Sequence, residues 1–161
     1  MEAAMSNVPT PSRSRTGIAD VRLRVLAEHA RLRGLIVEVD RLAIAVSAGD
    51  MRRIESLREL AARLYRMLSE HMDHEDRVVA PIIRGIDAWG PVRFEQMQRD
   101  HALQRVTLKQ AITDLDVDGT PLGQAVQSMC WELLHDMRRE EHDLLHPDLW
   151  RDDIVVVEIG G

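Results

Sequence analysis

Residues 54–82 read IESLRELAARLYRMLSEHMDHEDRVVAPI, and this stretch decides the fold. Its apolar and small residues recur at alternating steps of three and four, which is typical of the stripe that one α-helix buries against its neighbours. The stripe consists of Ile54, Leu57, Ala61, Leu64, Leu68, His71, Glu75, Val78 and Ile82. We therefore predict one long helix with two ionisable side chains, His71 and Glu75, where Leu or Val is expected.

Three further stretches have the same spacing, and each of the four predicted helices ends at a residue that interrupts helices. In chain order, Gly49, Gly85 and Gly119 follow the first three helices, and Pro147 follows the fourth. Pro91 and Pro121 stand at first helical positions, where proline is favoured. The predicted helices cover residues 18–47, 51–84, 90–118 and 120–146. Because the connections are short, sequential helices should be antiparallel neighbours, so the predicted fold is an all-α, up-down-up-down four-helix bundle.

The two ends of the chain lack this pattern. Residues 1–17 contain prolines and serines without periodicity, and we expect a mobile, disordered tail. Residues 149–161 include a β-type run at 154–159, which predicts a short extended tail. That tail could cross the bundle or pair with a second copy of the chain in a homodimer. The predicted bundle domain is therefore residues 18–148.

Composition and charge narrow the range of possible partners and cellular compartments. The formal charge of -6 disfavours a nucleic-acid or anionic-membrane partner. Cys130 is the one cysteine, which excludes an intramolecular disulfide and suits a reducing compartment. The N-terminal stretch has no apolar segment of the kind that signal peptides contain, and no stretch has the apolar length of a membrane span. We expect a cytoplasmic protein.

The predicted helices carry further polar residues on their buried stripes, and these share one level of the bundle. His29 and His101 lie about ten residues after the starts of the two helices that run up, and each residue adds about 1.5 Å along a helix axis. His71, Glu75 and Glu141 precede the ends of helices that run down. All five then lie ~10–20 Å from the same end of the bundle. They are predicted to form one inward-facing layer.

Such a layer is suited to a metal ion. A single histidine on a core stripe ordinarily finds a hydrogen-bond partner and needs no metal, so the argument depends on the joint placement. Neutral imidazoles donate lone pairs, and a cation offsets buried carboxylates. No cysteine falls in the layer, which disfavours a Cys-rich structural zinc site.

The residues of this layer stand in four segments, EHARLRGL (28–35), HMDHEDRVVAPII (71–83), DHALQ (100–104) and EEHDLLHP (140–147). These segments resemble the hemerythrin-like (HHE cation-binding) domain family. In His71-x-x-x-Glu75 the glutamate is followed six residues later by Pro81, and Glu141 precedes Pro147 by the same distance. The resemblance covers about residues 20–148 and implies a bundle around one or two non-haem irons. Roles in the family include handling of oxygen, nitric oxide or peroxide, and iron sensing.

The resemblance also implies which residues bind the metal. The chain departs from the family pattern at Met137, where a histidine four residues before Glu141 is expected, and at Arg105, where oxygen carriers have a second histidine. Fewer nitrogen ligands make a reversible oxygen carrier an unfavoured interpretation. By position, the implied ligands are His29, His71, Glu75, His101 and Glu141.

Several alternatives remain open at this point. His135 with Glu140 could replace the missing ligand, although His135 is two residues from Met137 and so rotated by roughly 200° on a helix. His74 could flank the site. The pocket could hold zinc or manganese in place of iron. A degenerate, metal-free bundle that acts as an interaction or regulatory module is the rival hypothesis from a different class.

Overall fold

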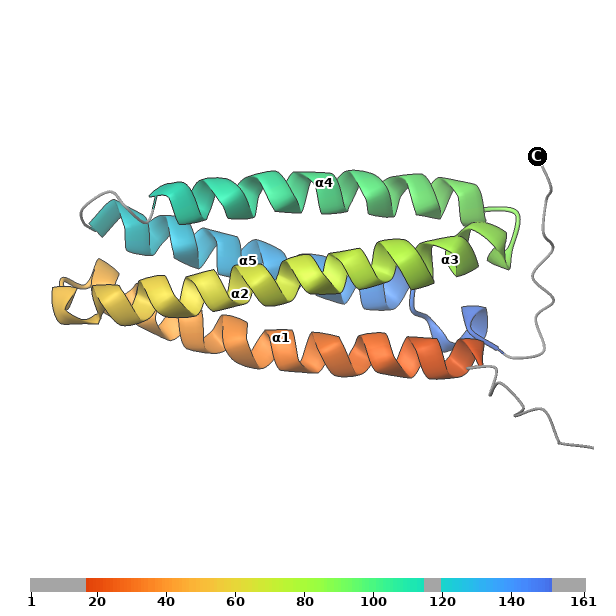
Figure 1. The fold of residues 1–161 in the computed structure, drawn as a ribbon, viewed down its shortest axis with the longest axis horizontal. Helices are drawn as coiled ribbons and strands as arrows, with labels where there is room; N and C mark the ends of the chain where they lie inside the picture. Colours follow the sequence, from red (N-terminus) through yellow and green to blue (C-terminus); the bar gives the residue numbers. More distant parts are fainter. Residues whose placement is uncertain (1–16, 115–119, 152–161) are drawn as a thin grey trace, which may run out of the picture.

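The computed structural model describes residues 17–114 and 120–151, and these residues form the predicted bundle. Four helical rods lie side by side with their axes close to parallel (Figure 1). Within the described residues no β-strand is present, so the predicted all-α class is confirmed. The elements are α1 (Ile18–Ser47), η1 (Met51–Arg53), α2 (Ile54–His74), η2 (Glu75–Val79), α3 (Ala80–Ile86), α4 (Gly90–Asp114), α5 (Thr120–Asp143) and η3 (Pro147–Leu149).

The second rod is one continuous helix with a single wide turn, and this turn begins at a residue of the polar layer. Elements α2 and α3 are joined by η2, a π-helical turn that starts at Glu75. Pro81 follows in the first turn of α3 and has no N–H to donate to the carbonyl four residues before it. The helix widens instead, and the Ala80 N–H bonds the Glu75 carbonyl five residues back. The proline therefore widens the second helix, which continues two residues beyond the predicted end at residue 84.

Short connections make successive rods antiparallel, as predicted. After α1 the chain turns at Gly49, whose φ of 94° lies in the left-handed region that favours glycine. At the first residue of α4, Gly90 approaches the backbone of Arg84 so closely that a Cβ would lie 2.6 Å from its carbonyl oxygen. Helix α5 ends at Asp143, three residues before the predicted end at residue 146. The predicted end of the third helix lies beyond the described part of α4.

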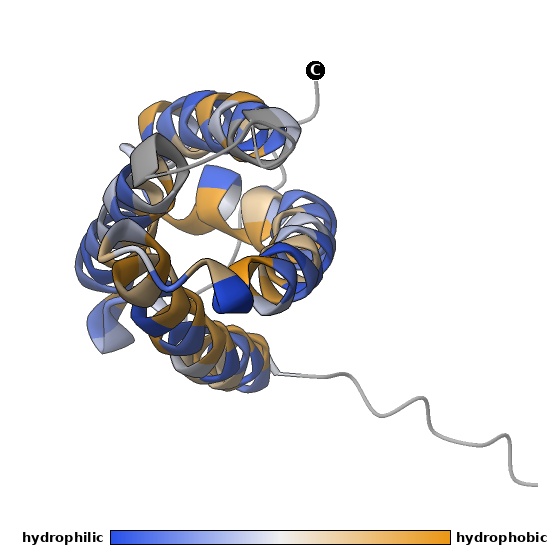
Figure 2. Cartoon of the chain, turned by 90° about the vertical axis from the view of Figure 1, so that its left-hand side faces the viewer, coloured by the Kyte–Doolittle hydropathy of each residue, from blue (hydrophilic) through white to orange (hydrophobic). Residues whose placement is uncertain are grey.

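The buried apolar side chains form two clusters, and polar residues lie between them. Figure 2 shows the apolar residues on the inner faces of the helices. The large apolar cluster includes Leu32, Leu68, Met72, Leu108 and Met137. The small apolar cluster consists of Val21, Val25, Val79, Ala80, Ile83, Ile86, Met97, Leu145 and Trp150. Along each rod the change from one cluster to the other occurs at the predicted polar layer.

The described part of the C-terminal segment packs on the bundle. Trp150 is buried in the small apolar cluster, and its indole Nε1 donates a hydrogen bond of 2.6 Å to the Leu144 carbonyl. The predicted N-terminal tail up to residue 16 and the predicted β-type run at 154–159 lie outside the described residues. Among the described helices, none has the combination of length and apolar character needed to cross a membrane.

Candidate metal centre

Four rods each contribute side chains to one polar layer in the middle of the core. His29 comes from α1, His71 from α2, Glu75 from η2 and His101 from α4, and their exposed fractions are 0%, 6%, 1% and 3%. Glu140 from α5 reaches the same level. We call these five residues the site layer. They are held there because the apolar residues before and after them on each helix are buried in the two clusters.

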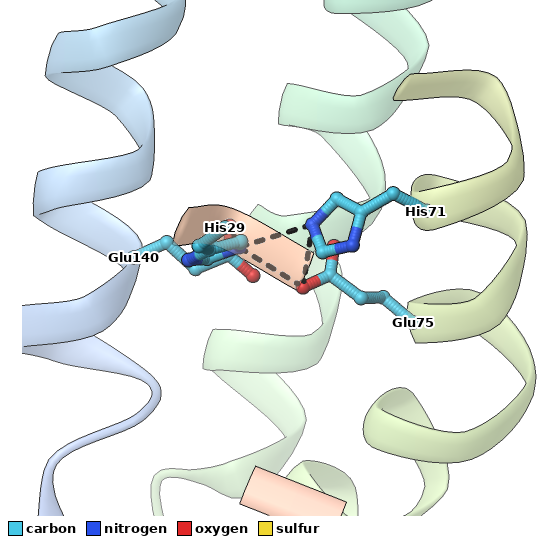
Figure 3. A group of neighbouring side chains, drawn as sticks. All are labelled: His29, His71, Glu75 and Glu140. Atoms are coloured by element: carbon cyan, nitrogen blue, oxygen red, sulfur yellow. Dashed lines mark hydrogen bonds and ion pairs between the residues drawn. The ribbon is translucent and has the colours of Figure 1, made fainter. Parts of the chain in front are cut away.

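The Nε2 atoms of His29 and His71 point toward each other, and the Nε2 atoms of all three site histidines point toward Glu75. Nε2 of His29 lies 3.0 Å from Nε2 of His71, and 3.6 Å from both Oε1 of Glu75 and Oε2 of Glu140. Figure 3 shows these four side chains converging from three sides of the bundle. One potential ligand atom from each of the four lies within 4.8 Å of the others. Four nitrogen and oxygen atoms thus surround one small space.

The two carboxylate oxygens of Glu75 face different imidazoles. Oε1 lies 3.2 Å from Nε2 of His71, and Oε2 lies 3.2 Å from Nε2 of His101. Both oxygens are fully buried, and neither has a hydrogen bond of good geometry. Glu140 Oε1 is in the same condition. A buried carboxylate without such bonds costs several kcal/mol unless a cation compensates it.

Each of the three imidazoles uses its other nitrogen for a carboxylate outside the site layer. Nδ1 of His29 lies 2.9 Å from Glu141, and Nδ1 of His71 lies 2.9 Å from Glu28. Nδ1 of His101 lies 2.8 Å from Asp76. An acceptor at this distance favours the tautomer with the proton on Nδ1. We infer that all three Nε2 atoms present lone pairs to the centre of the layer.

This arrangement of tautomers needs a positive charge in the middle. Two Nε2 lone pairs that are 3.0 Å apart, as in His29 and His71, repel each other unless a proton or a metal ion lies near both. A carboxylate that fixes the tautomer of a histidine in this way is the usual partner of a metal-binding imidazole. The residues present therefore fit a metal ion.

The charges of the site layer without a metal follow from its contacts. Burial raises the pKa of Glu75, but the imidazoles of His101, His29 and His71 outweigh this effect and hold the pKa well below its ordinary value. Burial lowers the pKa values of His71 and His101, yet Glu75 together with Glu28 or Asp76 leaves both raised. The metal-free layer thus holds the Glu75 carboxylate as an anion next to the imidazoles of His71 and His101, whose pKa values are raised.

Glu140 behaves in the opposite way. Burial raises the pKa of its carboxyl well above the ordinary value, and the negative charge of Glu75 raises it further, with smaller effects from Glu141 and Asp100. Two carboxylates that face each other in a core do not both ionise without a cation. Without a metal, Glu140 is therefore the neutral acid of the pair.

The structure places Glu140, rather than the predicted Glu141, beside the Nε2 atoms. Glu141 lies on the outer side of His29, where Oε1 contacts Nδ1 and Oε2 lies 2.7 Å from Arg33. The prediction of Glu141 as an inward carboxylate thus differs from the observed geometry by one residue. Adjacent helical residues are 100° apart, so both lie near the edge of the buried stripe and the spacing alone does not separate them.

This one-residue shift changes the position of the missing histidine. Four residues before Glu140 stands Asp136, which lines a pocket between α4 and α5 together with His101 and Glu140. Met137 is an ordinary member of the large apolar cluster. His135 is exposed and stacks on Trp131, with 5.5 Å between ring centroids, so it does not join the site layer. Of the open alternatives, Glu140 is placed at the centre and His135 is not.

The remaining candidates lie around the site layer. His74 flanks it, since its Nδ1 lies 3.1 Å from the same Glu28 oxygen that contacts His71. Arg105 contacts Asp76 at 2.9 Å. Glu28 and Asp76 were not predicted as site residues from the sequence. Their positions directly next to predicted ligands could have indicated them, because Glu28 precedes His29, and Asp76 follows Glu75 as Glu141 follows Glu140.

Comparison with known proteins identifies one family over the part of the chain that contains the site layer. The family model described as hemerythrin HHE cation binding domain matches residues 23–149, which include every residue of the site layer. No match was found for the chain among curated proteins or among solved structures.

Proposed function

The chain belongs to the hemerythrin HHE cation-binding domain family, and on this premise we propose that it binds one or two non-haem iron ions. The proposed ligands are the five residues of the site layer, with Glu141 in an outer position on His29. The observation that carries the proposal is the Glu75 carboxylate, which is buried, without a well-formed hydrogen bond, and faced by three imidazoles. A cation bound between these groups would compensate the buried carboxylate and would accept the lone pairs of the imidazoles.

The donor set supports iron among the possible metals. Imidazole nitrogen and carboxylate oxygen are the ligands of non-haem iron, whereas soft thiolate sulfur selects other metals. Cys130 lies in the large apolar cluster and offers no sulfur to the layer. Iron would supply redox chemistry and a position for a small ligand such as oxygen, nitric oxide or peroxide. The chain itself holds the imidazoles in one tautomer and keeps the site away from bulk water.

The two sides of Glu75 are unequal, which supports one strong and one weak ion position. On the Oε1 side stand His29 and His71, with Glu140 near His29. On the Oε2 side, His101 is the one imidazole among the described residues. Since nitrogen ligands strengthen binding of iron, the Oε1 side should hold its ion more tightly. We expect protein as isolated to contain closer to one iron per chain than two.

Metal analysis of protein purified from iron-replete cells tests this function. We expect iron in the wild type and at least a several-fold loss in Glu75→Ala. Glu59→Ala removes an exposed carboxylate from the same helix and serves as the matched control. Zinc or manganese in place of iron would keep the site and overturn the iron assignment. A wild type that contains no metal and melts identically with and without added Fe²⁺ would favour the metal-free interaction module.

A further inference from the structure

A short sequence pattern occurs twice in the bundle, once on each of two helices that contribute to the site layer. Residues 29–33 read HARLR in α1, and residues 101–105 read HALQR in α4. In both, an arginine stands four residues after a site histidine, so the two side chains lie on the same face of the helix about one turn apart. The repeat therefore places a permanent positive charge next to each of two proposed ligands.

In α1 the repeat forms a chain of two contacts that joins three residues. Arg33 lies 2.7 Å from Oε2 of Glu141, and the other oxygen of that carboxylate lies 2.9 Å from Nδ1 of His29. The carboxylate belongs to α5, whereas the arginine and the histidine belong to α1. Glu141 is thus held from both sides by the helix it faces.

In α4 the same chain is built with a carboxylate from the second rod. Arg105 lies 2.9 Å from Oδ2 of Asp76, and Oδ1 of that carboxylate lies 2.8 Å from Nδ1 of His101. Asp76 directly follows the proposed ligand Glu75, as Glu141 directly follows the proposed ligand Glu140. The α1–α5 pair and the α4–η2 pair therefore carry the same three-residue chain, and Arg105 additionally lies 2.9 Å from Oδ1 of Asp73.

The carboxylates in these chains are partly open to water, which is why a second partner matters. The exposed fractions of the Glu141 and Asp76 side chains are 26% and 32%. A carboxylate with that much solvent can rotate away from an imidazole, and loss of this acceptor typically weakens a metal site about 10–100-fold. A guanidinium stays charged at every relevant pH and forms strong hydrogen bonds with carboxylates. It can therefore hold each carboxylate both ionised and directed at Nδ1.

We propose that Arg33 and Arg105 are positioning residues of the metal site, which act on His29 and His101 through Glu141 and Asp76. The inference depends on the proposed metal-binding function and adds to it two residues that touch neither the metal ligands' Nε2 atoms nor Glu75. Two effects of an arginine oppose each other here. Its charge repels a cation, but the carboxylate between them screens that repulsion, so the positioning effect dominates.

Fe²⁺ affinity, measured anaerobically against a chromophoric chelator, tests the proposal. We expect Arg33→Gln and Arg105→Gln each to weaken Fe²⁺ binding about 3–10-fold, somewhat less than direct loss of an outer carboxylate. Their effects should multiply in the double variant, because the two chains of contacts share no residue. Arg105→Lys keeps the charge and should recover part of the affinity.

The matched control is Arg93→Gln. Arg93 and its partner Asp87 have exposed fractions of 27% and 35%, close to those of Arg105 and Asp76 at 36% and 32%. Asp87 accepts hydrogen bonds from a backbone N–H and from Arg93, and no imidazole in the described part of the chain contacts it. The control removes the same charge from the chain, so its Fe²⁺ affinity should equal that of the wild type.

A second measurement separates positioning from a merely structural role. In the Zn²⁺-loaded protein, the imidazole ¹⁵N and Nδ1–H NMR signals of His101 should shift in Arg105→Gln and not in Arg93→Gln. Unchanged or tighter Fe²⁺ binding in both arginine variants, with unshifted imidazole signals, would overturn this proposal while leaving the metal site intact. Absence of Fe²⁺ binding in the wild type would instead overturn the metal function together with it.

Discussion

In each histidine of the site layer, the two ring nitrogens have different partners. Nδ1 donates to a carboxylate at the edge of the bundle, and Nε2 turns toward Glu75 in the middle. The division is useful because the outer contact selects the tautomer that leaves the inner lone pair free. Glu28, Asp76 and Glu141 are therefore as much part of the site as the residues that face the centre.

The adjacent acids Glu140 and Glu141 should respond differently to the same substitution. Glu140→Gln should reduce iron per chain, because Glu140 is proposed as a ligand. Its metal-free melting temperature should stay within about 2 °C of the wild type, since the raised pKa of Glu140 means that a neutral amide replaces a neutral acid. Glu141→Gln should keep the iron content and weaken affinity about ten-fold. Metal analysis, chelator competition and calorimetry measure these effects, and the reverse pattern would show that Glu141 is the ligand.

At the scale of helices, register decides which side chains reach the site layer. The π-helical turn η2 begins at Glu75. Pro81, in the first turn of α3, has no N–H for the regular α-helical hydrogen bond that would otherwise replace this wider turn. On α5 the packing brings Glu140 inward, and Asp136 lies one turn before it, next to the α4–α5 pocket. Met137 faces the large apolar cluster instead.

Histidine substitutions at two neighbouring positions test this register of α5. Asp136→His should raise iron per chain, because it places an imidazole four residues before Glu140, as His71 stands four residues before Glu75. Met137→His should not raise it, and should destabilise the bundle by about 1–3 kcal/mol, since a polar ring enters an apolar cluster. Iron content and denaturant unfolding of the two variants provide the measurements. A gain of iron in Met137→His alone would restore the register predicted from the sequence.

A second prediction at this scale concerns two helical glycines, Gly34 within α1 and Gly123 in the first turn of α5, where α5 packs against α1. Gly34 is exposed, and a Cβ built there meets no atom within 4 Å, so Gly34→Ala should stabilise by about 0.5–1 kcal/mol through helix propensity. A Cβ at Gly123 would overlap Oγ of Ser47 and lie 2.6 Å from the Ala43 carbonyl oxygen. Gly123→Ala should therefore destabilise by about 1–3 kcal/mol. Urea unfolding measures both, and equal signs would contradict this packing.

For the molecule as a whole, the site layer divides the apolar core in two. The large and small apolar clusters supply the burial that stabilises the bundle, whereas the layer between them buries charged and polar groups. A bundle of this kind should fold without metal and become more stable when a cation enters. Stability is then linked to metal concentration, because only the folded chain brings the ligands together.

The stability of the metal-free protein and the additional stabilisation by Fe²⁺ should depend on pH with opposite signs. The pKa values of His71 and His101 are raised above 6.5, so in the metal-free protein their stabilising contribution is complete below 6.5 and is lost as pH rises through the raised values. The pKa of Glu75 is lowered from 4.5, so its contribution is lost only at more acidic pH. The metal needs unprotonated imidazoles, hence the stabilisation by Fe²⁺ should grow as pH rises from about 6 to 8. Melting curves at fixed Fe²⁺, with chelated controls, measure both trends.

A rise in melting temperature caused by Fe²⁺ that is constant across this pH range would mean that imidazoles do not bind the metal. His142→Ala provides a control, because His142 is exposed and contacts Asp143 rather than the site layer. Its removal should leave the difference between the metal-loaded and metal-free curves unchanged at every pH.

The sequence by itself determined the bundle and the level of its polar layer. Burial follows a period close to that of the helix, so the 3-4 spacing of apolar residues identifies the inner stripe whatever the partner helices are. His29, His71, Glu75 and His101 stand on that stripe, and the rise per residue places them at one height. The structure finds these four side chains together in the core.

Only the tertiary structure decided between Glu140 and Glu141, and only it revealed the outer carboxylates and arginines. These residues lie at the edges of the helices, where a rotation of a few tens of degrees moves a side chain from the core to the surface. That rotation is set by how α5 packs against α1 and how the π turn widens the second rod, both of which depend on contacts between residues far apart in the chain. Periodicity describes one helix at a time, and therefore carries no information about the helix it faces.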